Sequence, residues 1–166
     1  MTRQQAARQR KRIAGFSISE LLTVLALMGL LILFGGPAMA DAFRSYKVRS
    51  AADILATDVR ALRYAAVAGR ASLTMTLNDQ DDSTAPNQYT FTNFKGDTVT
   101  RRLESGVNLE TSSAASITFS SMGSTGQSSS QTLVVSMPVN DTRGDRYTIS
   151  VTPSGTVSAA YSTYTP

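Results

Sequence analysis

Apolar residues form one long uninterrupted block near the N-terminus of the chain. Residues 21–40 read LLTVLALMGLLILFGGPAMA and include no Asp, Glu, Lys or Arg. An α-helix rises about 1.5 Å per residue, so a helix over residues 16–40 is long enough to cross a hydrocarbon layer about 30 Å thick. The pattern therefore predicts a membrane-spanning helix over 16–40 that is apolar on all sides.

Beyond Ala40 the apolar residues return at every third or fourth position, which is the period of an amphipathic helix. The stripe that they form comprises Val48, Ala51, Ala52, Leu55, Val59, Leu62 and Ala66. Four charged residues lie off this stripe: Arg49, Asp53, Arg60 and Arg63. We therefore expect an amphipathic helix over 41–70, continuous with the first in one long helix over 17–68. Gly35, Gly36 and Pro37 are expected to kink or loosen it.

From Ala71 onwards the period changes to two, and Thr and aromatic residues become frequent, as in half-buried β-strands. Seven short strands are predicted, at residues 72–77, 88–94, 97–103, 116–120, 131–137, 146–152 and 156–161. Turn-forming residues occupy the joints, and about five C-terminal residues are expected to be loose. A long helix followed only by strands predicts the α+β class, with the helix packed on a mostly antiparallel β-sheet domain over 71–166.

Composition excludes most hydrolases and metalloenzymes. The 166 residues include no His and no Cys, so the chain lacks a Ser-His-Asp triad, a Cys nucleophile and the commonest zinc ligands. We expect no enzymatic activity, no cofactor and no metal site. A weak candidate for Ca²⁺ is the acidic loop 79–82, where Asp79, Asp81 and Asp82 offer oxygen ligands. A solvated turn is the alternative that we favour for this loop.

The positive charge is concentrated in the first fifteen residues. The chain has 16 Lys and Arg against 12 Asp and Glu, and five of the bases lie in residues 1–15, which contain no acid. The remaining residues have 11 bases and 12 acids. A basic segment before an apolar helix stays on the cytoplasmic side. Residues 1–15 are therefore predicted to be a cytoplasmic leader, and the sheet domain to be periplasmic.

Two kinds of proteolytic processing fit this N-terminus. Signal peptidase needs an apolar region followed by an A-x-A site, which Ala38-Met39-Ala40 supplies, and cleavage there would release a chain starting at Asp41. The second kind of processing would use the stretch from Gly15 to Glu20, which reads GFSISE. The carboxylate of Glu20 favours the second kind. A charge near the bilayer centre costs roughly 2.5–3.5 kcal/mol, and an ordinary signal sequence has no use for one.

The stretch G-F-S-I-S-E-L-L-T-V-L-A at residues 15–26 resembles the N-terminus of type IV prepilins and type II secretion pseudopilins. The resemblance implies that a prepilin peptidase cuts after Gly15 on the cytoplasmic side and methylates the amine of Phe16. It makes Glu20 the acidic fifth residue of the mature chain and Pro37 the family's helix proline. In a helix bundle, Glu20 can pair with the N-terminal amine of a neighbouring subunit and so fix the axial register.

The helix segment 49–70 and the sheet domain after it are similar to the FimT/GspH-type minor pilins. The similarity lies in the helix segment 49–70, in the turn from Phe119 to Gly123, and in Ser154-Gly155 near the closing strand. Thr156 departs from the family, which often has a basic residue there. The resemblance implies a minor pilin or pseudopilin, anchored in the inner membrane by one helix. It would assemble with other subunits into a type IV pilus or type II secretion pseudopilus, at the tip or in priming.

Binding of DNA in natural transformation is the alternative function that the resemblance allows. Four arginines of the sheet domain are the candidate contacts to DNA phosphates: Arg101, Arg102, Arg143 and Arg146. Residues 71–166 have five bases against eight acids, however, whereas a DNA-binding domain usually carries a clear basic patch. The expected partners are a prepilin peptidase, other pilin or pseudopilin subunits and inner-membrane lipid, with DNA as the alternative.

Overall fold

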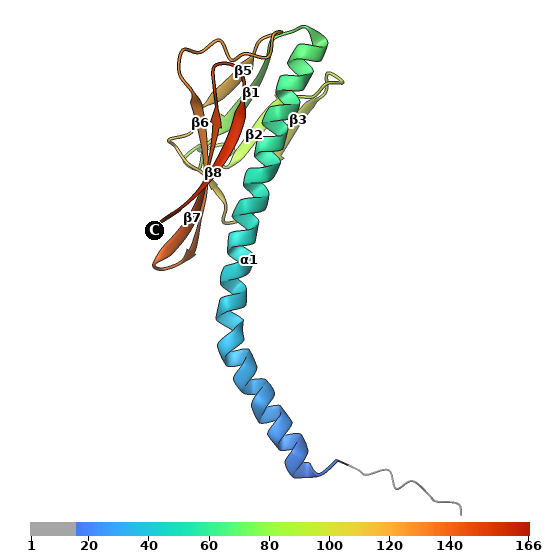
Figure 1. Cartoon of the computed structure of the whole chain (residues 1–166), viewed down its shortest axis with the longest axis vertical. Coiled ribbons are helices and arrows are strands. Elements are labelled where there is room, and N and C mark those ends of the chain that lie inside the picture. The colour runs from blue at the N-terminus through green and yellow to red at the C-terminus, as the bar shows by residue number, and fades with distance from the viewer. Residues whose placement is uncertain (1–15) are drawn as a thin grey trace, which may run out of the picture. The chain divides into compact units, whose positions relative to one another are not determined.

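The computed structural model describes residues 16–166, and its first element is one helix, α1, from Ile18 to Gly69 (Figure 1). The prediction of a single long helix is thus confirmed. The helix continues through residues 35–37, so neither the glycines nor Pro37 ends it. The chain divides close to this point into two units, one that ends at Ala38 and one that begins at Met39. The expected kink at Gly35, Gly36 and Pro37 stays a prediction.

Eight strands follow α1 and form two four-stranded antiparallel sheets (Figure 1). The first sheet has the order β3-β2-β1-β5, with β1 Leu73–Asn78, β2 Gln88–Thr92, β3 Thr98–Arg102 and β5 Ser116–Phe119. The second has the order β4-β6-β7-β8, with β4 Asn108–Leu109, β6 Gln131–Asn140, β7 Arg143–Val151 and β8 Val157–Tyr164. The predicted α+β class is therefore confirmed, with the strands shared between two sheets.

The predicted apolar stripe is the side of α1 that packs on the sheets. All seven of its members are buried: Val48, Ala51, Ala52, Leu55, Val59, Leu62 and Ala66. They form one core with inward side chains of both sheets, among them Met75, Tyr89, Phe119, Leu133 and Ile149. Burial of one Leu or Val side chain contributes about 1.5–3 kcal/mol. The stripe therefore supplies much of the free energy that holds the second half of α1 to the strands.

Polar contacts join α1 to the end of the β6–β7 hairpin. Arg44 donates to the carbonyl oxygen of Val139, and Asn140 Nδ2 donates to Asp41 Oδ2 over 3.1 Å. Asp41 is the first charged residue after the apolar block. These two contacts thus lie directly after the end of the uncharged sequence.

The strands differ from the predicted ones in three places. β4 was not predicted, because two residues are too few to display a period. The hairpin of β6 and β7 extends into residues 140–145, which were expected to form a turn, and only Asp141 and Thr142 remain between the strands. A register shift between Pro138 and Asn140 accommodates the proline. The expectation of a loose C-terminus was wrong up to Tyr164, which pairs with Gly144 of β7.

Candidate functional site

The apolar half of α1 is exposed at every residue from 18 to 36. Leu31, Ile32 and Phe34 are 72%, 73% and 73% exposed, respectively. This helix is long and apolar enough to cross a membrane. Soluble monomers rarely expose a contiguous apolar surface of more than a few hundred Å². The side chains of this segment therefore require cover from lipid or from another protein.

Glu20 is the one charged residue of α1 before Asp41. It lies in the first turn, where the positive end of the helix dipole favours a carboxylate. Four residues earlier, Phe16 is 79% exposed. Gly15 and the leader over 1–15 lie outside the described residues. The processing role of Gly15 and Phe16 and the assembly role of Glu20 stay predictions.

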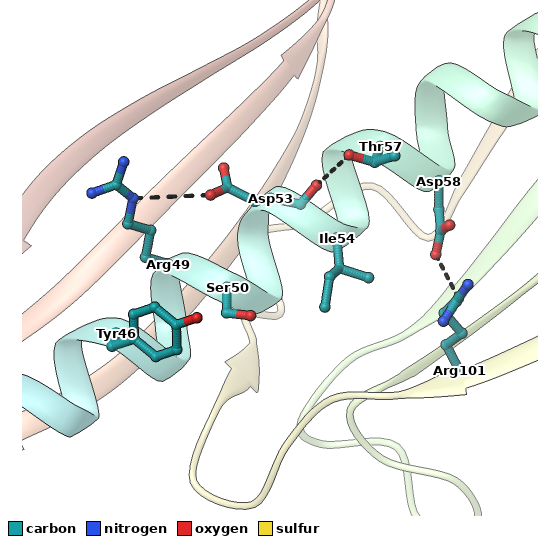
Figure 2. Close-up of a pocket in the computed structure, with 8 residues that line it drawn as sticks. All are labelled: Tyr46, Arg49, Ser50, Asp53, Ile54, Thr57, Asp58 and Arg101. Carbon is teal, nitrogen blue, oxygen red and sulfur yellow. Dashed lines mark hydrogen bonds and ion pairs between the residues drawn. The ribbon is translucent and has the colours of Figure 1, made fainter.

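Arg101, expected as a DNA contact, forms an ion pair with a carboxylate of α1 (Figure 2). Its Nε lies 2.8 Å from Oδ2 of Asp58, and the same oxygen accepts a 2.7 Å hydrogen bond from Tyr89 Oη. Asp58 is only 7% exposed. Burial, reinforced by the hydrogen bond to Asp58, raises the pKa of Tyr89 far above its usual range. The phenol therefore keeps its proton, and the three groups tie α1 to β2 and β3.

Arg143, the third of the expected DNA contacts, is also paired. Its Nη2 lies 2.8 Å from Oδ1 of Asp145, whose side chain is 2% exposed, and Tyr161 Oη donates to the same oxygen over 2.9 Å. Burial alone would raise the pKa of Asp145. Hydrogen bonds from Ser45, Arg143 and Tyr161 outweigh that effect and lower the pKa of this carboxyl. The carboxylate thus stays ionised and balances the charge of Arg143.

Arg146 has a carboxylate partner, whereas Arg102 has none within residues 16–166. Arg146 Nε donates to Glu110 Oε1 over 2.8 Å, and its guanidinium lies 4.8 Å from the centre of the Tyr164 ring. Arg102 is exposed at the end of β3 and, within residues 16–166, takes part in no ion pair. Three of the four arginines singled out for DNA therefore have carboxylate partners inside the domain.

The carboxylates of the acidic loop 79–82 accept hydrogen bonds from nearby backbone amides. Asp82 Oδ1 accepts from the amides of Thr84 and Ala85 over 2.9 and 2.8 Å, and these hydrogen bonds lower the pKa of Asp82. Asp79 Oδ1 accepts from the amide of Asp81 over 3.0 Å. Across the described part of the chain, no three acidic, His or Cys side chains converge as a metal site requires. The geometry is that of a solvated turn.

A shallow hollow of about 430 Å³ lies between α1 and Arg101 (Figure 2). Its acidic side chains are Asp53, which lies 3.9 Å from Arg49 on the exposed side of the helix, and Asp58, which is bound to Arg101 and Tyr89. Both carboxylates are thus engaged with cations. The hollow offers neither a nucleophile beside a base nor a pair of free carboxylates, which general acid–base chemistry needs.

The two glycine turns that carried the minor-pilin resemblance meet each other at the C-terminal end of α1. Gly123 and Gly155 are both buried and have φ angles of +79° and +83°. Arg63 joins them, because its Nε donates to the carbonyl oxygen of Gly123 over 3.0 Å and its Nη2 to that of Ser154 over 3.4 Å. Residues 32 positions apart in sequence thereby form one junction with the helix.

Two features of the domain were missed in the sequence. Asp58 is buried although it is acidic, and its spacing from Leu55 and Leu62 placed it on the apolar stripe, which was a usable signal. The role of Arg63 had no local signal, because its acceptors lie 60 and 91 residues away.

Comparisons with known proteins add no family to this description. A scan against protein-family models, a search of curated proteins and a search of solved structures each gave no match. The described architecture, one long apolar N-terminal helix followed by an antiparallel β-sheet domain, is compatible with a pilin-like protein.

Proposed function

We propose that this chain is a minor pilin or pseudopilin. It would be held in the inner membrane by one helix and assembled through that helix into a type IV pilus or type II secretion pseudopilus. The observation that carries the proposal lies in α1. Its first half is exposed and apolar with one carboxylate in the first turn, and its second half is packed on a β-sheet domain.

The exposed apolar half of α1 would be covered first by lipid and later by other subunits. Lipid would cover side chains such as Leu31 and Phe34 before assembly, and helices of neighbouring subunits would cover them afterwards. The five bases of residues 1–15 would keep the N-terminus cytoplasmic and direct the sheet domain to the periplasm. A helix of this kind serves as both an anchor and an assembly element.

Glu20 supports assembly more than simple anchoring. A carboxylate in an apolar segment is costly, and a partner of opposite charge offsets the cost. Cleavage after Gly15 would create such a partner, the amine of Phe16, and a neighbouring subunit would present its own Phe16 amine to Glu20. The ion pair would then select one axial offset between subunits.

The proposed function requires partners and no catalytic chemistry of the chain itself. The partners are a prepilin peptidase, other pilin or pseudopilin subunits and inner-membrane lipid. We place DNA binding second, because Arg101, Arg143 and Arg146 have carboxylate partners at 2.8 Å. A DNA phosphate would have to compete with each of these carboxylates.

Mass spectrometry of the mature N-terminus tests the proposal. The full chain, expressed with a prepilin peptidase, is expected to begin at a methylated Phe16, and Gly15→Ala is expected to block this cleavage. Ala40→Leu is the matched control, because it destroys the A-x-A site and should leave the mature mass changed only by the substitution. A mature chain that starts at Asp41 would overturn the proposal.

A further inference from the structure

The edge strand β8 is long, uncharged and open on its outer side. Its eight residues read VSAAYSTY, and residues 158–163 are all exposed. The other sheet ends are shorter: β3 has five residues and carries Arg101 and Arg102, β5 has four, and β4 has two. Proteins usually protect edge strands by charge, proline or short length. β8 has none of these protections.

The backbone groups that β8 presents outward can be assigned from its pairing with β7. The amide of Thr152 donates to the carbonyl oxygen of Thr156 over 3.0 Å, which makes this the first hydrogen-bonded pair of the ladder. Because such pairs alternate along antiparallel strands, the odd-numbered residues from Val157 to Thr163 direct their N–H and C=O groups away from β7. Within residues 16–166, β8 pairs only with β7.

A basic and apolar groove of about 520 Å³ continues the line of β8 beyond Val157. Arg60 and Arg63 of α1 line it, together with the exposed side chains of Tyr64 and Met122, and none of its lining residues is acidic. Met122 is 88% exposed and Tyr64 71%. A solvent-exposed Met and Tyr beside two cations form a surface that suits an apolar group joined to an anion.

Both arginines keep free hydrogen-bond donors. Arg60 Nη2 donates to the carbonyl oxygen of Val157 over 3.4 Å, and Arg63 uses Nε and Nη2 toward Gly123 and Ser154. A guanidinium has five N–H groups, so each side chain can still bind a carboxylate. The contact of Arg60 with Val157 also places its guanidinium at the first outward carbonyl of the edge.

We propose that β8 and this groove bind the extended C-terminal peptide of a partner protein by strand addition. An antiparallel peptide runs opposite to β8, so its C-terminal end lies beside Val157. Its carboxylate meets Arg60 and Arg63, and its last side chain, which should be apolar, packs against Tyr64 and Met122. Charge complementarity thus selects a free C-terminus over an internal loop. The inference goes beyond assembly through α1 and does not depend on it.

Selection of peptides with free C-termini tests the proposal. The full chain in detergent micelles is exposed to a phage library that displays random decapeptides at a free C-terminus, with empty micelles as the background. We expect enrichment of uncharged, β-branched sequences that end in an apolar residue. Synthetic peptides of the enriched sequences are then expected to bind at least tenfold more weakly as C-terminal amides. No enrichment over micelles, or equal binding of acid and amide, would overturn the proposal.

Variants of the chain separate the two parts of the site. Ala159→Pro removes an outward N–H and blocks strand addition without removing a bond to β7, so binding should fall at least tenfold, whereas Ala159→Ser should bind normally. Arg60→Gln should weaken the acid peptide and leave the amide unchanged. Arg102→Gln is the matched control, since this arginine lies on the other sheet. Equal binding by Ala159→Pro and Ala159→Ser would refute strand addition.

The peptide itself provides a test that does not depend on how the variants fold. Single N-methylation of the peptide backbone should abolish binding at alternate positions, those whose amides point at β8, and be tolerated at the positions between them. A loss of binding that follows no alternation would overturn the strand-addition geometry, even if Ala159→Pro failed to fold as judged by near-ultraviolet circular dichroism.

Discussion

Gly155 lies in direct backbone contact with Gly123, so closely that a β-carbon on Gly155 would come 1.9 Å from the carbonyl oxygen of Gly123. Neither backbone can yield easily, because the same oxygen accepts the hydrogen bond of Arg63. The φ angle of +83° at Gly155 disfavours any other residue as well. The junction therefore requires glycine for two independent reasons.

Gly155→Ala is expected to lower the free energy of unfolding by more than about 2 kcal/mol, through the clash and the backbone strain together. Gly126→Ala is the matched control, since Gly126 has a φ of +68° but nothing within 4 Å of the added carbon. The control should lower the free energy of unfolding by only about 1 kcal/mol, the cost of the left-handed backbone at a residue with a β-carbon. Urea unfolding of the full chain in detergent measures both, and equal losses would contradict the close contact.

Arg101→Gln is expected to destabilise the domain by about 1–2 kcal/mol, because Asp58 is then buried without its cation. The expected loss of stability is modest because the Arg101 side chain is 50% exposed and solvent weakens its ion pair. Arg49→Gln removes the exposed partner of Asp53 and should cost at most about 0.5 kcal/mol. Thermal unfolding compares the two variants. If both shift the midpoint equally, the buried network is not stabilising.

The stability of the domain should fall in acid through Asp145. Its pKa in the folded domain lies below the ordinary value of 3.8, so its contribution is present above pH 3.8 and is lost as the pH falls through the lower, folded value. Asp145→Asn should remove this part of the pH dependence and lower stability at pH 7. Urea midpoints measured between pH 2 and pH 7, about the range over which carboxyls titrate, provide the check. An unchanged profile in the variant would exclude this role of Asp145.

Glu20→Gln is expected to abolish or sharply reduce entry of the subunit into filaments, while membrane insertion and the sheet domain stay intact. The substitution keeps the size of the side chain and removes only the charge that would pair with a Phe16 amine. Sheared filament fractions and membrane fractions, probed for the chain, give the measurement. Ser19→Ala is a neighbouring control that leaves the charge in place. Normal incorporation of Glu20→Gln would contradict the proposed pairing.

Binding of duplex DNA by the full chain in detergent is expected to be weak and to disappear between about 50 and 200 mM salt, as for contacts made by few cations. Arg102→Gln should reduce whatever binding occurs more than Arg146→Gln does, because Arg146 is paired with Glu110. Gel retardation at two salt concentrations measures this. Tight binding that persists at about 200 mM salt would make DNA binding the favoured function.

The fold could be predicted as far as local patterns determine it. The stripe from Val48 to Ala66 and the seven strand segments each repeat with the period of their element, and all of them are found in the structure. β4 was missed because its two residues show no period. The end of the β6–β7 hairpin was mistaken for a turn, because the sequence from Asn140 to Asp145 is rich in turn-forming residues while the ladder with β8 keeps it extended.

The candidate contacts were less predictable than the fold, because they depend on residues far apart in the chain. From the sequence, Arg101 and Arg146 were interpreted as cations available to DNA. Their partners Asp58 and Glu110 lie 43 and 36 residues away, so no local pattern indicates the ion pairs. Only the fold brings these charges together. The N-terminal motif, in contrast, is contiguous, and its interpretation needed no tertiary contact.

The burial of the α1 stripe has a consequence for biosynthesis. Ala66 precedes Ile149 of β7, a member of the same core, by 83 residues. At about 5–20 residues per second, translation needs roughly 4–17 s to supply that strand after the helix is made. During this interval the native cover of the stripe is incomplete, because the core residues of β7 are not yet made. The order of synthesis, helix first and cover last, thus makes the final strands the step that protects the nascent chain from aggregation.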